Sequence, residues 1–344
     1  FDSVSRACWD WLYSSRHLSL DLAIPKQGPG STSERIVGNS KYVFRSWHKR
    51  LEPYFPIDSN ALVNINALDS PEFRDLELIS EEHELPSRLV DVPKTQKTPR
   101  LIAIEPVCMQ YTQQAIQGIL VRALEDHRLT AGHVNFTDQS VNRDLALSSS
   151  STGLMATLDL SSASDRVPLS LVERMFRYHP DIWGAIEACR TRKVQFPDGK
   201  IFSIKKFASM GSALCFPVES MYFYTICIGA LLKKHNLPVT YRNVFKMSRY
   251  VYVYGDDIIV PTDDVGAVID HLQKYYCKVN VRKSFWNGKF RESCGMDAYN
   301  GYNVCVTYIR TMPPNNRRQT NEIVSWVKTA QLFDKDACYL TSDY

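Results

Sequence analysis

Three aspartates occupy positions from which their carboxylates could hold divalent metal ions. Asp256 and Asp257 follow Gly255 between two β-rich runs, residues 250–254 and 258–260. This pattern predicts a hairpin whose turn, Tyr254-Gly255, sets two carboxylates at the rim of a sheet, with the glycine relieving the backbone at the bend. Asp159 ends an alternating apolar segment upstream and is predicted to lie on a neighbouring strand.

Oxygen ligands of this kind suit Mg²⁺, which needs only a few carboxylates beside phosphate oxygens and water. Two such ions, about 3.5–4 Å apart, activate a hydroxyl and neutralise a triphosphate during nucleotidyl transfer. We therefore predict a site for two Mg²⁺ ions at Asp159, Asp256 and Asp257. Mn²⁺ accepts the same ligands and is expected to substitute. The alternative is a solvated hairpin turn, although the valines, isoleucines and tyrosines on both sides favour a central strand pair.

A basic loop precedes these elements. Lys94, Lys97 and Arg100 recur every third residue in a stretch flanked by prolines and free of acids from Val92 to Ile104. Such cations with restricted backbone freedom are typical of a triphosphate site, and a solvated charge run is the alternative.

Further polar residues are weaker candidates. Ser209, Gly211 and Ser212 precede an apolar helix, where the glycine permits close backbone approach and the hydroxyls could contact a sugar or a template. Lys283 is a candidate general acid for departing pyrophosphate, against the alternative of a surface lysine. Asp165 is equally a ligand contact or a helix N-cap.

The elements that position these residues follow from hydrophobic periodicity. Leu154, Ala156, Leu158 and Leu160 alternate with other residues, which predicts a strand with one buried face and Asp159 on the other. The order of the following predicted elements, strand, helix, helix, hairpin, helix, strand, is that of a ferredoxin-like antiparallel sheet with helices on one face. The predicted elements are a strand at 101–104, helices at 116–124, after Pro168, at 219–232 and at 265–272, hairpins at 193–207 and 250–260, a short strand at 278–281, and a linker at 148–152.

Composition bounds the class of protein. The chain has 344 residues, of which 44% are hydrophobic and 23% charged, and this predicts a folded α+β protein of two or three subdomains. Its net charge of +4 is compatible with a polyanionic partner. The nine cysteines include no pair at zinc spacing, which favours a reducing intracellular setting. The longest apolar run, Met221 to Leu232, is too short to span a bilayer.

Taken in order, these motifs resemble those of the catalytic (beta) subunit of the RNA-directed RNA polymerase, or replicase, of single-stranded RNA bacteriophages (the levivirus, Qβ replicase family). The resemblance covers roughly residues 90 to 310. The motifs that carry it are residues 92–106 (VPKTQKTPRLIAIEP), 138–142 (DQSVN), 158–165 (LDLSSASD), 209–211 (SMG), 253–261 (VYGDDIIVP) and 290–295 (FRESCG).

The resemblance implies a right-hand polymerase fold, with mainly helical fingers at 1–152 including the basic loop 90–106, a palm at 153–310 with a hairpin insertion at about 187–208, and a partial, truncated thumb at 311–344. It implies metal binding by Asp159, Asp256 and Asp257, triphosphate binding by Lys94, Lys97 and Arg100, and ribose contact by Asp165. The implied partners are template and product RNA, NTPs, host elongation factors Tu and Ts and a ribosomal protein, in the cytoplasm of a bacterial host and without a membrane.

Other functions remain open at the level of sequence. A reverse transcriptase shares a Tyr-x-Asp-Asp turn, but the polar neighbourhood of Asp165 and Ser209 favours ribonucleotides. A two-metal nuclease or phosphatase would not need the basic loop. A catalytically inactive RNA-binding fragment of a replicase would bind RNA without incorporating nucleotides.

Overall fold

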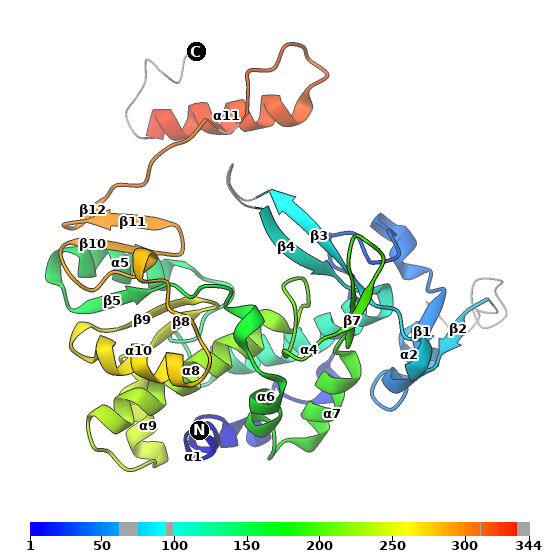
Figure 1. Cartoon of the computed structure of the whole chain (residues 1–344), viewed down its shortest axis with the longest axis horizontal. Coiled ribbons are helices and arrows are strands. Elements are labelled where there is room, and N and C mark those ends of the chain that lie inside the picture. The colour runs from blue at the N-terminus through cyan, green and yellow to red at the C-terminus, as the bar shows by residue number, and fades with distance from the viewer. Residues whose placement is uncertain (62–74, 94–98, 310, 336–344) are drawn as a thin grey trace.

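The computed structural model describes residues 1–61, 75–93, 99–309 and 311–335 (Figure 1). The helices are α1 (Asp2–Trp9), α2 (Ile57–Asn60), α4 (Val107–Asp126), α5 (Ser140–Thr152), α6 (Leu169–Met175), α7 (Pro180–Cys189), α8 (Cys215–Lys234), α9 (Tyr241–Ser248), α10 (Val265–Lys274) and α11 (Thr320–Lys335). The strands are β1 (Ser46–His48), β2 (Glu77–Ile79), β3 (Ser87–Pro93), β4 (Pro99–Ile104), β5 (Met155–Leu158), β6 (Lys193–Gln195), β7 (Ile201–Ser203), β8 (Tyr252–Tyr254), β9 (Asp257–Pro261), β10 (Phe290–Ser293), β11 (Met296–Tyr299) and β12 (Tyr302–Asn303).

A small antiparallel sheet of order β5-β9-β8 lies at the centre of the chain. The predicted strand at 278–281 is wrong as a regular strand. Instead, Val279 and Phe285 make isolated antiparallel bridges to Leu160 and Thr157 on the free edge of β5. A 3₁₀ turn at Val281–Lys283 lies between the two bridges and interrupts the pairing. The strand order remains that of the predicted ferredoxin-like sheet, with a broken fourth strand.

Both faces of this sheet are covered, which corrects the prediction of helices on one face only. Ala156 and Leu158 of β5 belong to the main core, to which α8 and α10 also contribute. On the other face Thr157 and its partner Ile259 are also buried, and α5 with β10 and β11 packs there. Leu154, predicted to be buried, is 70% exposed because β5 begins only at Met155.

The serine-rich stretch 148–152, predicted to be a linker, is instead the last turn of α5. Its hydroxyls bond to carbonyls three or four residues back, as when Ser150 Oγ donates to the Leu147 carbonyl at 2.7 Å. Ser149 and Ser150 are buried. A helix of small residues can therefore pack closely on β5 and β11, and Gly153 ends it in the left-handed conformation.

Helix α8 forms the middle of the core. The predicted helix at 219–232 is confirmed and extends to 20 residues, which makes it long and apolar enough to cross a membrane, contrary to the length predicted. However, 89% of the most apolar stretch of this helix is buried inside the protein. Trp9 of α1 donates its indole N–H to Thr225 Oγ1 on α8 at 2.8 Å, so the first helix seals this core.

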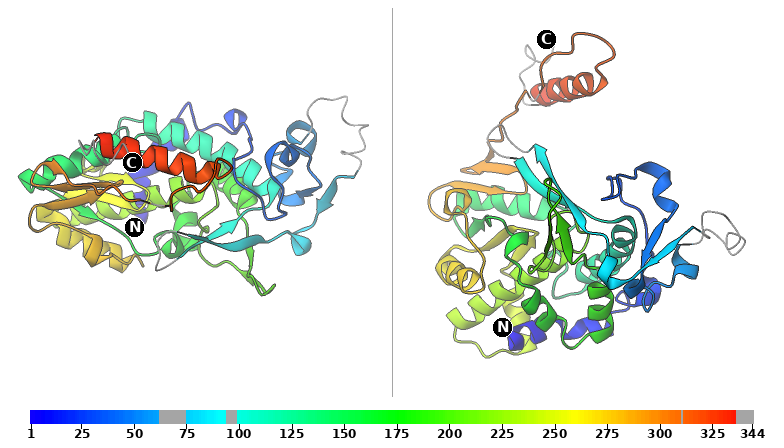
Figure 2. Two further views of the ribbon diagram at one scale, coloured as in Figure 1. Left: turned by 90° about the horizontal axis from the view of Figure 1, so that it is seen from above. Right: turned by 45° about the vertical axis from the view of Figure 1, so that its right-hand side comes forward.

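A second sheet, of order β4-β3-β6-β7, stands beside the central one (Figures 1 and 2). The predicted strand at 101–104 and the predicted hairpin around Gly199 are confirmed as parts of it. The hairpin pairs in parallel with β3, Ser87 opposite Val194, although more than a hundred residues separate the two strands. Segments far apart in sequence therefore share one surface.

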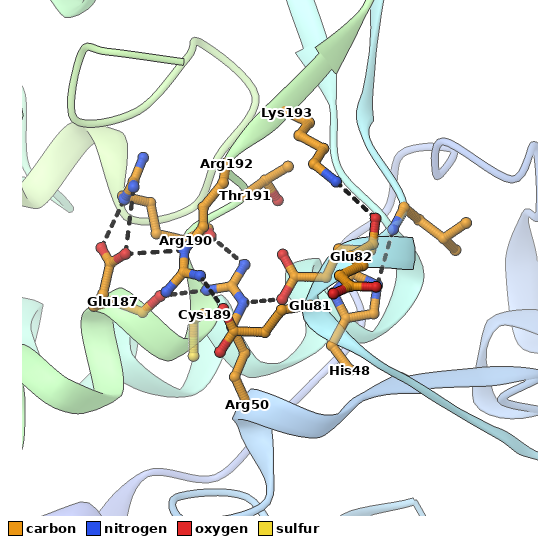
Figure 3. Close-up of polar contacts among 12 residues, drawn as sticks. His48, Arg50, Glu81, Glu82, Glu187, Cys189, Arg190, Thr191, Arg192 and Lys193 are labelled. Atoms are coloured by element: carbon orange, nitrogen blue, oxygen red, sulfur yellow. Dashed lines mark hydrogen bonds and ion pairs between the residues drawn. The ribbon is translucent and has the colours of Figure 1, made fainter. Parts of the chain in front are cut away.

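A polar network fastens the base of this hairpin to the N-terminal segment (Figure 3). Arg50 and Glu84 form a buried ion pair, with only 6% and 5% of their side chains exposed. The Arg50 guanidinium also donates to the carbonyls of Glu187 and Arg190 at the end of α7. These bonds fix where the chain leaves α7 and enters β6. Helix α11 lies apart from the rest of the molecule (Figures 1 and 2).

Candidate active site

Asp159 and Asp256 line one cleft of about 480 Å³. Asp159 follows the last residue of β5, and Asp256 lies in the tight turn between β8 and β9. Because Leu158 pairs with Ile258, the end of one strand adjoins the turn of the next hairpin. The other lining residues are Arg100, Leu160, Ser161, Ser162, Ala163, Ser164, Met210, Gly211, Ser212, Cys215, Phe216, Glu219, Asn280 and Lys283.

The interrupted fourth strand holds Asp159 in place. Asn280 Nδ2 donates to Asp159 Oδ2 at 2.8 Å, and the Asn280 backbone N–H donates to the Asp159 carbonyl at 2.9 Å. The Asp159 backbone N–H donates to Ser284 Oγ at 3.0 Å. Sequence reasoning missed Asn280 and Ser284, because neither residue type nor spacing signals a partner more than a hundred residues away.

Asp257 lies on the side of the turn away from the cleft lining. Its carboxylate accepts from Ser293 Oγ at 3.3 Å and lies 3.7 Å from Cys294 Sγ, both in the turn of the β10–β11 hairpin. Burial, then the charges of Asp256 and Asp159, raise the pKa of Asp257 to about 6. The charges of Asp256 and Asp159 therefore reach the Asp257 carboxyl and disfavour its ionisation, and a cation there would offset that effect.

The donor set fits magnesium in its chemistry. Asp159 and Asp256 offer carboxylate oxygens to one cleft, and Mg²⁺ commonly takes one or two protein carboxylates together with substrate phosphates and water. Within the ranges that the structure describes, no group of three or more His, Cys, Asp or Glu side chains converges closely enough to hold an ion alone. Water and substrate phosphate oxygens would supply the remaining ligands of such an ion.

A buried carboxyl that the sequence did not single out also faces this cleft. Glu219 of α8 is 7% exposed and lies 3.6 Å from Cys215 Sγ. Burial, followed by the charge of Asp256, raises the pKa of Glu219 to about 8. The position sits inside the apolar run of α8, so its sequence neighbours suggested only core packing.

The turn at Gly255 has no room for a side chain. Gly255 has φ +61°, and a Cβ there would lie 2.1 Å from Cε2 of Phe216. The Gly255 N–H donates to Ser220 Oγ at 3.2 Å, which ties the turn to α8. Tyr254 donates its hydroxyl to the Phe136 carbonyl at 3.1 Å and packs edge-on against Phe216.

The loop Ser209–Ser212 is pinned to the second sheet and to α4. The Ala103 N–H donates to the Met210 carbonyl at 2.8 Å. Ser212 Oγ donates to Gln113 Oε1 at 3.0 Å, and Gln113 Nε2 donates to the buried Glu105 carboxylate at 3.3 Å. The Ser212 hydroxyl is therefore engaged with the buried Gln113 side chain, although Gly211 and Ser212 both line the cleft.

Only some of the residues predicted to bind the triphosphate or the ribose line the cleft. Arg100 and Lys283 line the cleft, whereas Lys94 and Lys97 lie outside the described residues. Asp165 sits inside a 3₁₀ turn, Ser164–Arg166, rather than at a helix N-cap, and pairs with Lys206. Asp165 and Ser209 line a neighbouring hollow rather than this cleft.

This arrangement can be compared with known proteins. A sequence model of the family described as RNA replicase, beta-chain, matches residues 69–344. The chain belongs to this family. The matched range contains all three aspartates and every described residue that lines the cleft.

Its relatives are much longer proteins. The RNA-directed RNA polymerase subunit beta of Qbeta virus (strain MX1) is 33% identical over 252 residues, which are 72% of this chain and 40% of the relative. The RNA-directed RNA polymerase beta chain of Escherichia phage MS2 is 33% identical over 219 residues, 64% of this chain and 37% of that one. The chain therefore spans about two fifths of the length of the curated relatives it matches.

Two solved structures share the fold of this chain. The RNA-dependent RNA polymerase of a human picorbirnavirus matches with a TM-score of 0.50 and 12% identity, over 71% of this chain and 52% of that one. The RNA-dependent RNA polymerase from bacteriophage phi12 matches with a TM-score of 0.50 and 12% identity, over 86% and 54%. At such identities the likeness concerns the fold alone, and it confirms the predicted polymerase fold of mixed helices and sheets.

Proposed function

We propose that this chain is the catalytic part of an RNA-directed RNA polymerase that copies a viral single-stranded RNA genome. The observation that carries the proposal is the shared cleft of Asp159 and Asp256, with Arg100 and Lys283 on its walls. Two carboxylates facing two cations suit a nucleoside triphosphate whose phosphates approach bound metal ions. Membership of the RNA replicase beta-chain family supports the same function.

In this reaction the 3′ hydroxyl oxygen of the growing strand bonds to the α-phosphorus of the NTP, and pyrophosphate leaves. Asp159 and Asp256, with Asp257 behind the turn, would hold two Mg²⁺ ions, for which Mn²⁺ can substitute. When bound, the ions supply charge neutralisation and acidify the attacking hydroxyl. Asn280 keeps the Asp159 carboxylate oriented through its 2.8 Å hydrogen bond.

Cations of the chain act on the triphosphate. Arg100, together with Lys94 and Lys97, binds the phosphates. Lys283 gives a proton to the departing pyrophosphate, since a lysine beside phosphates is a suitable general acid. The backbone of Gly211 and Ser212, which also line the cleft, contacts the nucleotide.

The ribose contact is assigned to the edge of the cleft. Asp165 and Ser209 recognise the 2′ hydroxyl, and Asp165 exchanges its ion pair with Lys206 for that contact. This assignment makes ribonucleotides, rather than deoxyribonucleotides, the substrates.

The domain organisation and the partners are part of the same proposal. The chain divides into fingers at 1–152, a palm at 153–310 that carries the hairpin of β6 and β7, and the beginning of a thumb at 311–344. RNA template and product and NTPs are the substrates and products, in the cytoplasm of a bacterial host. Host elongation factors Tu and Ts and a ribosomal protein are the proposed protein partners.

The test is incorporation of labelled ribonucleotides with Mg²⁺ on RNA and DNA templates side by side. We expect incorporation on RNA, and an Asp256→Asn variant should lose about a thousandfold or more, since metal positioning accounts for several kcal/mol. Asp263→Asn, an exposed aspartate at the far end of the same hairpin, is the matched control and should retain activity.

Other outcomes would support one of the alternative functions. Incorporation of deoxyribonucleotides in preference to ribonucleotides would point to a reverse transcriptase. RNA binding that weakens with salt, without incorporation by this chain, would point to an inactive RNA-binding fragment.

A further inference from the structure

One face of the sheet β4-β3-β6-β7 borders a hollow among the described residues. Alternation along the strands places Leu89 of β3, Ala103 of β4, and Val194 and Phe202 of the hairpin on this face. With Phe196, Met210 and neighbours they line a hollow of about 640 Å³. The opposite sheet face, with Val90 and Ile102, lines a different hollow.

This face exposes large apolar side chains that a soluble protein normally covers. Phe202 is 51% exposed, Leu101 56%, Phe196 40% and Met210 38%. The two phenylalanine rings lie 5.1 Å apart, edge to face, across the hairpin. Flat aromatic surfaces held in this way offer stacking partners to unpaired bases.

Lysine side chains line the hollow together with the phenylalanines. Lys200, Lys205 and Lys206 line the hollow together with two acids, Asp165 and Asp198. Lys206 pairs with Asp165, and Lys200 lies 3.0 Å from Asp198. Three lysines and two acids leave the lining with a net charge of +1, which favours a polyanionic ligand.

The hollow adjoins the catalytic cleft, because Met210 lines both. Ser209 and Asp165 line the hollow, and their chain neighbours Met210 and Ser164 line the cleft. At the hairpin base Arg192 pairs with Glu81 at 2.8 Å, and Lys193 Nζ donates to the Glu82 carbonyl at 3.0 Å (Figure 3). These bonds lie at the foot of the hairpin and leave its aromatic face free to take a ligand.

We propose that this hollow binds unpaired RNA, and that template bases stack on its aromatic side chains before they reach the catalytic cleft. The proposal rests on the proposed polymerase function for its assignment to the template. Phe196 and Phe202 stack on bases, and Lys205 contacts the phosphodiester backbone. A protein partner would match the apolar lining, but the position next to the catalytic cleft and the excess of cations favour single-stranded nucleic acid.

The test measures binding of a short, unstructured, fluorescent RNA oligonucleotide by anisotropy, without NTPs or divalent ions. The double variant Phe196→Ala/Phe202→Ala should bind about 5- to 150-fold more weakly, the range expected for losing one stacked base at about 1–3 kcal/mol. Ile201→Ala is the matched control, because Ile201 is 52% exposed on the opposite face of β7. Its affinity should equal that of the unmodified chain, and circular dichroism checks that each variant is folded.

Two further measurements test the contacts themselves. Lys205→Ala should lower the slope of log affinity against log salt by about 0.7, the value for one phosphate contact on a single strand. Phe202→Trp keeps a stacking ring, so its added fluorescence should be quenched by single-stranded RNA and its affinity retained. Unquenched Phe202→Trp fluorescence on saturation with RNA would overturn the proposal even if the alanine variants failed to fold.

Incorporation assays separate this inference from the proposed function. If the folded double variant binds single-stranded RNA as tightly as the Ile201→Ala control, the proposed RNA site is refuted, whether or not the chain incorporates nucleotides. If binding depends on the two phenylalanines but the chain incorporates nothing on any template, the RNA site stands and the proposed polymerase function falls.

Discussion

Replacing Gly211 by alanine tests how the cleft wall is built. Gly211 has φ +122°, and a Cβ there would lie 2.1 Å from the backbone oxygen of Ala103. Since that oxygen belongs to strand β4, it cannot swing away as a flexible side chain would. The loop must retreat and break the 2.8 Å hydrogen bond between the Ala103 N–H and the Met210 carbonyl.

The expected cost has two parts. A residue forced into this backbone region costs about 1–3 kcal/mol, and the lost hydrogen bond costs about 1 kcal/mol. The free energy of unfolding of Gly211→Ala should therefore fall by about 2–4 kcal/mol. Activity should fall as well, because the displaced loop lines the cleft beside Asp159 and Asp256.

The assay is urea unfolding followed by circular dichroism, with nucleotide incorporation measured on the same samples. Gly199→Ala is the matched control: Gly199 has φ +85° but nothing within 4 Å of the added Cβ, so it carries only the backbone cost of about 1–2 kcal/mol. Equal losses of stability in the two variants would refute the steric argument. A stable Gly211→Ala variant with unchanged incorporation would show that the loop has no part in the cleft.

Three further outcomes are expected. Asn280→Ala should lower kcat/KM for incorporation about 10- to 100-fold through loss of the bond to Asp159, with unfolding little changed, whereas an unchanged kcat/KM would exclude the positioning role. Arg50→Met should cost about 3–5 kcal/mol of unfolding free energy in denaturant, because Glu84 stays buried and unpaired, and pairing it with Glu84→Leu should recover most of that loss. Burial raises the pKa of Glu105 from 4.5 to about 7, so its stabilising contribution is full below pH 4.5 and is lost as pH rises through 7. Glu105→Gln should flatten the stability curve over that interval by up to about 3 kcal/mol, and a curve as steep as before would contradict the assignment.

Local signals explain what could be predicted along the chain. The Gly255-Asp256-Asp257 turn, the hairpin around Gly199 and the helix α10 each lie where the sequence predicted them. Turn residues and hydrophobic periods act over a few neighbouring residues, so they can be read without the fold. The failures are informative in the same way: serines at 148–152 carry no helical period, yet tertiary packing on β5 and β11 makes them the end of α5.

By itself, the sequence determined which carboxylates end their strands, because strand alternation and a glycine turn specify Asp159 and Asp256 locally. Only the tertiary structure decided what surrounds them. Asn280 reaches Asp159 across 121 positions of sequence. Glu219 holds a raised pKa because the apolar core of α8 keeps water away from it. Such effects depend on distance and desolvation in space, and no pattern of neighbours along the chain encodes them.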